Sequence, residues 1–215
     1  SDPPHASWAT ITPPGLLIGD TLSALIHPRA ACAALAAAIS ARGGEIAGAG
    51  VPVGAVVWAT GMAGLQDLSE VAGRQVGSAV KGQGALLHFS APRMPQIFAD
   101  GIHIVPHADG TTAVGSTSER DYDDLFTTDA RLEDVIERAM QAAPVLHGAR
   151  VTERWAGLRP RARTRAPILG PHPLRAGEFI ANGGFNIGFG MAPKIARVMA
   201  DLVLENVDAI PDDFR

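Results

Sequence analysis

One arginine and one glycine-rich loop are the features of this chain whose residue types and spacing best suit chemistry. Arg159 follows an apolar run and precedes Pro160, which favours an extended backbone at the arginine. A guanidinium in such a place can bind a planar carboxylate through two parallel hydrogen bonds. The alternative is a structural ion pair with an internal carboxylate, and the spacing alone does not separate the two.

The glycine-rich loop runs from Gly183 to Gly190 and contains four glycines between a predicted strand and a predicted helix. Glycine lets a backbone approach a ligand closely, and the amides at a helix N-terminus attract negative charge. The loop therefore predicts contact with a cofactor edge or an anion, with a plain tight turn as the alternative.

Histidines and acidic residues do not predict a metal site. His103 and His107 lie on a strand-like segment, which places them about 13 Å apart along the chain. The acidic loop at 118–129 lacks the glycine and terminal glutamate of a calcium loop and is expected to be a solvated surface. His103 alone is either a polar group in a pocket or an exposed histidine.

Basic residues do not indicate a nucleic-acid partner. Arg161, Arg163 and Arg165 alternate, so an extended backbone would align them as a phosphate-binding stripe. No aromatic residues interleave with them, and the net charge of the chain is -4. Ser116 lies outside any G-x-S-x-G elbow, so nothing signals a serine hydrolase.

Composition indicates a folded, soluble protein. The 215 residues are 47% hydrophobic and 19% charged, which suffices for a core and excludes a disordered chain. The lone Cys32 excludes an intrachain disulfide and is expected to be a small buried apolar residue. No apolar run approaches the roughly 20 residues of a membrane-spanning helix. We expect a cytoplasmic protein without an integral membrane segment, and homo-oligomerisation stays open.

Hydrophobic and turn patterns predict an α/β segment followed by an antiparallel one. The opening through Gly19 is expected to be irregular or a strand fragment. Pro28 starts an alanine-rich run that predicts a helix over 28–42. The continuous β-prone run at 55–60 is typical of a strand buried in a parallel sheet. Alternation on both sides of Asp109-Gly110 predicts an antiparallel hairpin.

The second half of the chain predicts further helices and strands. Thr128 or Asp129 caps a helix over 129–142, which Pro144 ends. Its apolar stripe consists of Leu132, Val135, Ile136 and Ala139. The other predicted elements are strands at 151–158 and 179–182 and a helix at 192–204 with Ile195, Val198, Met199, Leu202 and Val203 as its core face.

Several segments carry a resemblance because they occur in a fixed order. They are Val57-Trp58-Ala59-Thr60-Gly61, Lys81-Gly82-Gln83, Ile104-Val105-Pro106 with Gly115-Ser116-Thr117, Trp155-Ala156-Gly157-Leu158-Arg159-Pro160 with Pro167-Ile168-Leu169-Gly170, and the loop from Gly183 to Pro193. In this order they resemble the FAD-dependent D-amino-acid oxidase superfamily, and within it the glycine oxidase and sarcosine oxidase type. The match covers most of residues 25 to 210.

The resemblance implies an FAD-dependent oxidoreductase that oxidises the C–N bond of a small amino acid or amine, such as glycine, sarcosine or a D-amino acid, by hydride transfer to flavin. Arg159 matches the carboxylate-binding arginine of the family. His103 occupies a substrate-facing hairpin position that is often Tyr, so it is the second catalytic candidate. The residues that match the cofactor-binding segments are Thr60, Gly61, Gly184, Phe185, Asn186, Ile187 and Gly188. Asn186 stands where the family often has Arg.

The resemblance also implies the fold class, α/β plus α+β. Part of a Rossmann-like FAD-binding domain is joined to a mostly antiparallel substrate-domain sheet flanked by helices. Residues 1–75 are expected to form the partial FAD-binding domain and residues 76–154 the substrate domain. Residues 155–215 return to the FAD domain with the flavin loop and a C-terminal helix.

The dinucleotide-binding motif of the family has no match in the chain. The nearest candidate, Gly48-Ala49-Gly50, is followed by Pro52 rather than by a helix. We therefore expect a C-terminal portion of a flavoenzyme that is inactive by itself and does not hold FAD tightly, since the pyrophosphate site is missing. The alternative is a non-catalytic module that binds a small carboxylate through Arg159.

Overall fold

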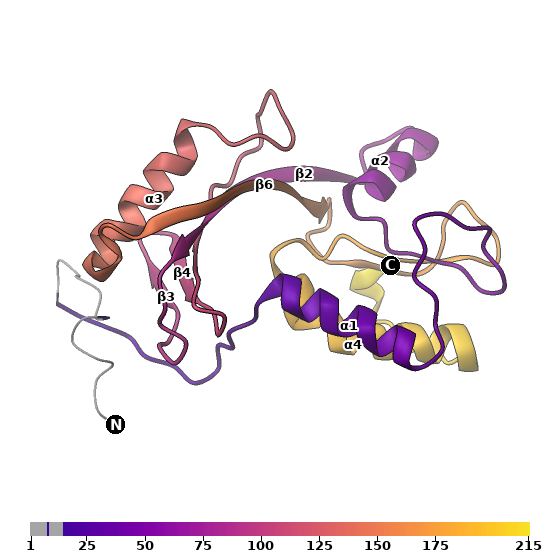
Figure 1. Cartoon of the computed structure of the whole chain (residues 1–215). Helices are drawn as coiled ribbons and strands as arrows, with labels where there is room; N and C mark the ends of the chain where they lie inside the picture. Colours follow the sequence, from indigo (N-terminus) through magenta and orange to yellow (C-terminus); the bar gives the residue numbers. More distant parts are fainter. Residues whose placement is uncertain (1–7, 9–14) are drawn as a thin grey trace. The chain divides into compact units, whose positions relative to one another are not determined.

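The computed structural model describes Trp8 and residues 15–215 (Figure 1). The structure expected for the opening of the chain falls largely outside these residues. The chain divides into two compact units. Unit 1 contains residues up to 49, 82–118 and 124–157, and unit 2 contains 50–81, 119–123 and 158–215.

Unit 1 is built on most of a five-stranded sheet with the strand order β3-β4-β5-β2-β6. The strands are β2 (Gly77–His88), β3 (Ile97–Ala99), β4 (Ile102–Pro106), β5 (Thr112–Gly115) and β6 (Arg150–Ala162). β4 and β5 form the antiparallel hairpin predicted around Asp109-Gly110, with His103 opposite Gly115 and Pro106 opposite Thr112. Register thus places His103 on the same face of the sheet as Gly115.

Helix α3 (Ala130–Ala142) packs against β4 and β5 (Figure 1). Its N-cap is Asp129, whose carboxylate accepts a hydrogen bond from the Arg131 amide at 2.9 Å. The predicted apolar stripe is confirmed, because Leu132, Val135, Ile136 and Ala139 are all buried. They join Leu87, Ile104 and Val114 in one hydrophobic core. The 3-10 helix η1 (Pro144–Leu146) follows α3, as the helix-ending role of Pro144 predicts.

Gln83 ties the middle of the sheet to the start of α3. Its side chain is fully buried, and its Nε2 donates to Asp129 Oδ1 at 2.9 Å. In return the Asp129 amide donates to Gln83 Oε1 at 2.8 Å. The glutamine of the Lys81-Gly82-Gln83 motif therefore satisfies both of its polar ends inside the protein, as a buried amide requires.

Helix α1 (Pro28–Ala41) begins at the predicted residue and ends within one residue of the predicted end. Its N-cap is His27, whose side chain accepts a hydrogen bond from the Ala30 amide at 3.5 Å. The prediction that Cys32 is buried is wrong, because the thiol-bearing residue is exposed. α1 buries none of its residues in the described structure, so its small side chains have no core to enter.

Unit 2 contains a three-stranded sheet with the strand order β1-β8-β7. The strands are β1 (Val57–Trp58), β7 (Ile168–Pro171) and β8 (Phe179–Asn182). β1 runs parallel to β8, as the α/β pattern predicts, and β7 runs antiparallel to it. The prediction of a long buried strand at 55–60 is wrong. β1 has only two residues and is partly exposed, because it lies at the sheet edge with a single partner.

Two helices flank the strands of unit 2. They are α2 (Gly61–Ala72), which sequence patterns did not reveal, and α4 (Gly188–Glu205). The 3-10 helices η2 (Phe185–Ile187) and η3 (Asp212–Phe214) complete the unit. The predicted face of α4 is confirmed, since Val198, Met199 and Leu202 are buried beside Leu169 and Ile210. None of the helices in the described part of the chain combines the length and the apolar character needed to cross a membrane.

Candidate functional site

Arg159 lies on β6, in the part of the strand that belongs to unit 2. The strand continues through Pro160 to Ala162, further than the predicted end at 158. The guanidinium is half-buried, and its Nη1 donates to the backbone oxygen of Lys81 at 3.5 Å. Burial lowers the pKa of Arg159, and the charge of Glu119 acts in the opposite direction. An arginine keeps its proton in proteins, so the strand presents a fixed cation.

Glu119 supplies negative charge close to this cation. Its backbone exchanges two hydrogen bonds with Lys81, each of 2.9 Å, and its side chain is 7% exposed. The expectation that the acidic loop is a solvated surface is therefore wrong for Glu119, because pairing with β2 draws the residue inward. Each alternative for Arg159 has an observation in its favour. The nearby carboxylate of Glu119 favours a structural ion pair, and the partial exposure of the guanidinium favours binding of a ligand carboxylate.

Asn182 joins the two segments that were predicted to contact the cofactor. It ends β8 and is 7% exposed. Its Nδ2 donates to the Gly61 oxygen at 2.8 Å, and its Oδ1 accepts from the Gly183 amide at 2.7 Å. The start of α2 and the glycine loop are thus held together by one side chain. A polar residue at the end of an apolar strand was the sequence signal for this role, but its partners lie far along the chain.

The glycine loop is shaped by close backbone contacts. A Cβ atom at Gly184 would lie 3.0 Å from the Gly188 Cα atom, so the turn into η2 admits no side chain there. Gly184 also forms an antiparallel bridge with Arg161. The Arg161 guanidinium lies 5.8 Å from the centre of the Phe185 ring, a cation–π distance. Arg161 is two residues from Arg159 on β6, so this strand links the arginine and the loop.

The glycine loop also passes into a helix sooner than predicted. α4 begins at Gly188 rather than at 192, and the propensities of Gly190 and Pro193 argued against that early start. No described side chain caps α4 or α2. Amides at a helix N-terminus favour the oxygen atoms of a ligand.

A hollow of about 260 Å³ lies beside the end of β1 in unit 2. Thr60, one of the predicted cofactor residues, lines it together with Trp58 and Arg175. The Arg175 guanidinium stacks over the Trp58 ring at 4.4 Å, and the Trp58 indole nitrogen donates to Glu178. The wall of the hollow thus combines a planar aromatic face with a positive charge.

His103 belongs to unit 1, whereas Arg159 and the predicted cofactor residues all belong to unit 2. Its imidazole is exposed on the face of the sheet that does not pack on α3, and the Phe98 ring lies 4.5 Å away, centre to centre. Partial burial lowers the pKa of His103. The neutral imidazole is therefore the main form at neutral pH. Trp155 covers Gly84 on this same face, where a Cβ at Gly84 would lie 2.7 Å from the indole.

The three alternating arginines do not form a basic stripe. Arg161 is the last but one residue of β6, but Arg163 and Arg165 lie in the turn that follows, and Arg165 has a φ of 69°. Alternation along an extended strand thus stops after Arg161. The three guanidinium groups do not share one extended face, which removes the geometric basis of a phosphate-binding stripe.

The contact between Phe98 and His103 makes a prediction for histidine titration. We expect the NMR-detected pKa of His103 to lie below its ordinary value of 6.5. Phe98→Ala should raise it toward 6.5, because removing the ring returns water to the imidazole. The matched control Phe126→Ala removes an exposed ring of the acidic loop and should leave the titration unchanged. If Phe98→Ala left the pKa of His103 unchanged, that result would contradict burial as the cause of the lowered pKa.

Comparisons with known proteins agree with this arrangement. The family model described as FAD dependent oxidoreductase matches residues 10–202. Glycine oxidase of Pseudomonas putida is 36% identical over 126 residues, which are 58% of this chain and 34% of that protein. The chain thus spans about a third of the length of such curated relatives.

Solved structures of the same kind share the fold. Glycine oxidase from Geobacillus kaustophilus has a TM-score of 0.63 at 29% identity, over 73% of this chain and 43% of that one. Iminodiacetate oxidase from Chelativorans sp. has a TM-score of 0.66 at 25% identity, over 76% of this chain and 46% of that one. The antiparallel sheet with its helices and the α/β part are thus those of FAD-dependent oxidases with a Rossmann-like fold. The family model covers nearly the whole sequence, and the chain belongs to the FAD dependent oxidoreductase family.

Proposed function

We propose that this chain supplies the substrate-binding and flavin-bordering surfaces of an oxidoreductase that oxidises the C–N bond of a small amino acid or amine. Glycine, sarcosine and D-amino acids are the proposed substrate class. The observation that carries the proposal is the half-buried Arg159, which shares β6 with the Arg161 bridge to the glycine loop. The similarity to glycine oxidases supports it.

The residues of the glycine loop and of the α2 start fit the edge of a flavin. A Cβ at Gly61 or Gly188 would meet no described atom within 4 Å beyond its own chain neighbours and helix backbone, so both positions are open to a planar group. The uncapped amides of α2 and α4 can donate to flavin oxygens or to an anion. The hollow at Thr60 adds a concave surface beside them. When bound, FAD supplies the redox chemistry by accepting a hydride from the carbon that bears the amine.

Arg159 is proposed to hold the carboxylate of the substrate. Two parallel charge-assisted hydrogen bonds would fix the orientation of that carboxylate and of the carbon next to it. Such positioning converts binding into rate, because the reacting carbon is already placed for transfer. Glu119 is proposed to balance the Arg159 charge before substrate enters, which reduces the cost of keeping a half-buried cation.

The amine is proposed to react in its neutral form, so its proton leaves to water before the C–H bond breaks. Loss of the hydride from carbon leaves a protonated imine, and water then releases a carbonyl product together with ammonia, or with methylamine where the nitrogen carries a methyl group. His103, neutral near pH 7, is proposed as a polar wall of the substrate domain at 76–154. Residues 1–75 and 155–215 are proposed to contribute to FAD binding.

The direct test of the proposed function is a substrate panel on the flavin-loaded full-length protein. Ammonia release should occur with glycine or a D-amino acid, and methylamine release with sarcosine. Neither product should form with acetate, which has the carboxylate without the amine. Binding of glycine and acetate alike, with no ammonia and no flavin reduction from any amine in the panel, would instead favour a non-catalytic carboxylate-binding module.

The flavin-bordering role of Gly188 makes a further prediction. Gly188→Leu should leave the fold intact, because the site is open and Leu is a good helix former. It should weaken FAD binding by about 1–3 kcal/mol through overpacking against the ring, or roughly five- to 150-fold. Flavin fluorescence titration measures the affinity and circular dichroism the fold.

Gly190→Leu is the matched control for this experiment. Gly190 also lies in the first turn of α4 and is also open, but it is outside the proposed flavin-contacting segment. An equal loss of FAD affinity in both variants, or none in Gly188→Leu, would refute the assignment of Gly188.

A further inference from the structure

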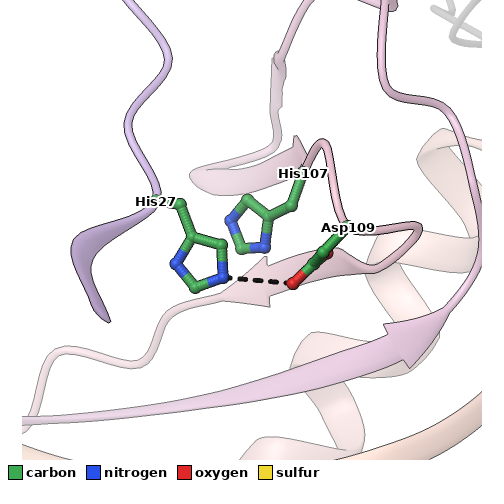
Figure 2. A group of neighbouring side chains, drawn as sticks. All are labelled: His27, His107 and Asp109. Carbon is green, nitrogen blue, oxygen red and sulfur yellow. Dashed lines mark ion pairs between the residues drawn. The ribbon is translucent and has the colours of Figure 1, made fainter. Parts of the chain in front are cut away.

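A cluster of two histidines and one aspartate lies beside the β4–β5 turn of unit 1, and none of the three side chains is proposed above as a contact of substrate or flavin. Figure 2 shows His27, His107 and Asp109 turned toward one another. One nitrogen of each ring and one carboxylate oxygen all lie within 4.8 Å of each other. His27 immediately precedes α1, and the other two residues come from the hairpin turn. Segments about 80 positions apart in the sequence thus meet here.

Hydrogen bonds already orient each of the three side chains, through atoms other than those that would bind an ion. Asp109 Oδ1 accepts from the Thr111 amide at 3.0 Å and from the Thr111 hydroxyl at 2.6 Å. His107 Nδ1 pairs with the same hydroxyl at 3.2 Å. These contacts leave Asp109 Oδ2 and the second nitrogen of His107 for a common partner. Outer contacts of this kind are what fix the ring and carboxylate orientation of metal ligands.

His27 completes the cluster from the other segment. Its Nε2 lies 3.4 Å from Asp109 Oδ2, and its ring stacks on the His107 ring with 4.1 Å between centres. Its Nδ1 accepts a hydrogen bond from the Ala30 amide, but the distance of 3.5 Å makes that bond weak. A cation bound to His27 Nε2 would displace the hydrogen that this atom shares with Asp109. The neutral imidazole would then carry its one proton on Nδ1, so α1 would lose only the weak bond from the Ala30 amide.

To bind a metal ion, the ligand atoms of the three residues must move closer together, and the burial of these residues permits that movement. Ligand atoms 2.0–2.2 Å from a tetrahedral ion lie about 3.5 Å apart, so a separation of up to 4.8 Å must shorten. His107 is 7% exposed and acts as the fixed partner. The side chains of His27 and Asp109 are 28% and 52% exposed, so both can rotate toward it. The stacked rings must also tilt apart, which the exposed side of His27 allows.

The ligand set selects the class of ion. Two imidazole nitrogens and one carboxylate oxygen suit a first-row divalent cation such as Zn²⁺. They do not suit Mg²⁺ or Ca²⁺, which require mainly oxygen ligands. Three protein ligands leave a fourth position for water.

We propose that His27, His107 and Asp109 bind one Zn²⁺ ion, which fastens the start of α1 to the β4–β5 turn. This site is independent of the proposed oxidase chemistry, because none of its three side chains is among the individual residues proposed to contact substrate or flavin. Its role is to stabilise the junction between the segment before α1 and the hairpin.

The test is calorimetric titration of the metal-free full chain with Zn²⁺. We expect one ion per chain and a rise in Tm on binding. His107→Ala and Asp109→Ala should each weaken binding at least about tenfold. The matched controls His88→Ala and His147→Ala remove exposed histidines of unit 1 that lie outside the cluster and should change nothing. Binding that is absent from the parent chain, or that depends on His88 or His147 instead, would overturn the proposal.

A second variant guards against misfolding as the cause of lost binding. His27→Asn keeps a good N-cap for α1 but removes the imidazole, so the helix should persist while Zn²⁺ affinity falls. Hydrogen exchange gives an independent readout: Zn²⁺ should slow exchange at Ala31, whose amide donates to the His27 backbone oxygen, in the parent chain and not in His27→Asn. Unchanged affinity in a folded His27→Asn variant would show that His27 is not a ligand and would overturn the three-residue site.

Discussion

Replacing Arg159 with alanine is expected to lower kcat/KM for glycine, sarcosine and D-amino acids at least thirtyfold in the flavin-loaded protein. Truncating one partner of a desolvated charge pair costs about 2–5 kcal/mol, and each 1.4 kcal/mol is roughly tenfold in rate or affinity. The guanidinium is half-buried on β6, so solvent cannot replace it as a carboxylate partner. Steady-state kinetics measure the change.

Two further variants define what the Arg159 result means. Arg159→Lys keeps the charge but loses the planar fork, so its kcat/KM should fall between those of the parent and Arg159→Ala. Arg163→Ala removes an exposed arginine four residues on and should leave kinetics unchanged. Turnover that is untouched by Arg159→Ala would contradict the carboxylate-binding role and favour the internal ion pair with Glu119.

The second large effect concerns stability and lies in the core of unit 1. Leu132→Ala should lower the free energy of unfolding by about 2–5 kcal/mol, because it leaves a cavity in a packed interior. Leu132 is fully buried on α3 among Ile104, Val114 and Leu87. Urea denaturation followed by circular dichroism measures the loss.

Leu35→Ala is the control for this cavity. Leu35 lies on α1 and is 63% exposed, so the same change of side chain should shift stability by less than about 0.5 kcal/mol. Equal losses for the two leucines would mean that α1 is buried against a surface outside the described structure, and that α3 is not distinguished by its packing.

Elements with a strong local pattern could be predicted from the sequence. The four apolar positions of α3 recur at helical spacing, and Asp129 and Pro144 mark its two ends, so local rules and tertiary packing agree. The β4–β5 hairpin follows in the same way from alternation around an Asp-Gly turn. In both cases the information lies within about a dozen consecutive residues.

Features that depend on distant partners could not be predicted. The sequence of β1 is typical of a central strand, but in the described sheet β1 lies at one edge. It pairs there with β8, more than a hundred residues later in the chain. Glu119 looks like one acid among several until the bridge to Lys81 buries it. Asn182 donates a hydrogen bond to the backbone oxygen of Gly61, which lies far away in the sequence. Such roles are set by pairings that composition and periodicity do not contain.

The candidate site shows the same division. The sequence points to Arg159 and to the glycine loop as separate features, and the structure adds the strand β6 and the Arg161 bridge that connect them. For the histidines, the sequence does not indicate the arrangement that the structure shows. The spacing of His103 and His107 along a strand argues against a shared metal ion, whereas the His107 ring stacks on His27 instead, a partner that no local pattern reveals.

The most direct test of the central claim compares glycine with methylamine, which lacks the carboxylate, in anaerobic reduction of the bound flavin. The parent protein should be reduced much faster by glycine, and Arg159→Ala should remove most of that preference by slowing glycine alone. A glycine preference of the same size in Arg159→Ala as in the parent would contradict the claim that Arg159 holds the substrate carboxylate.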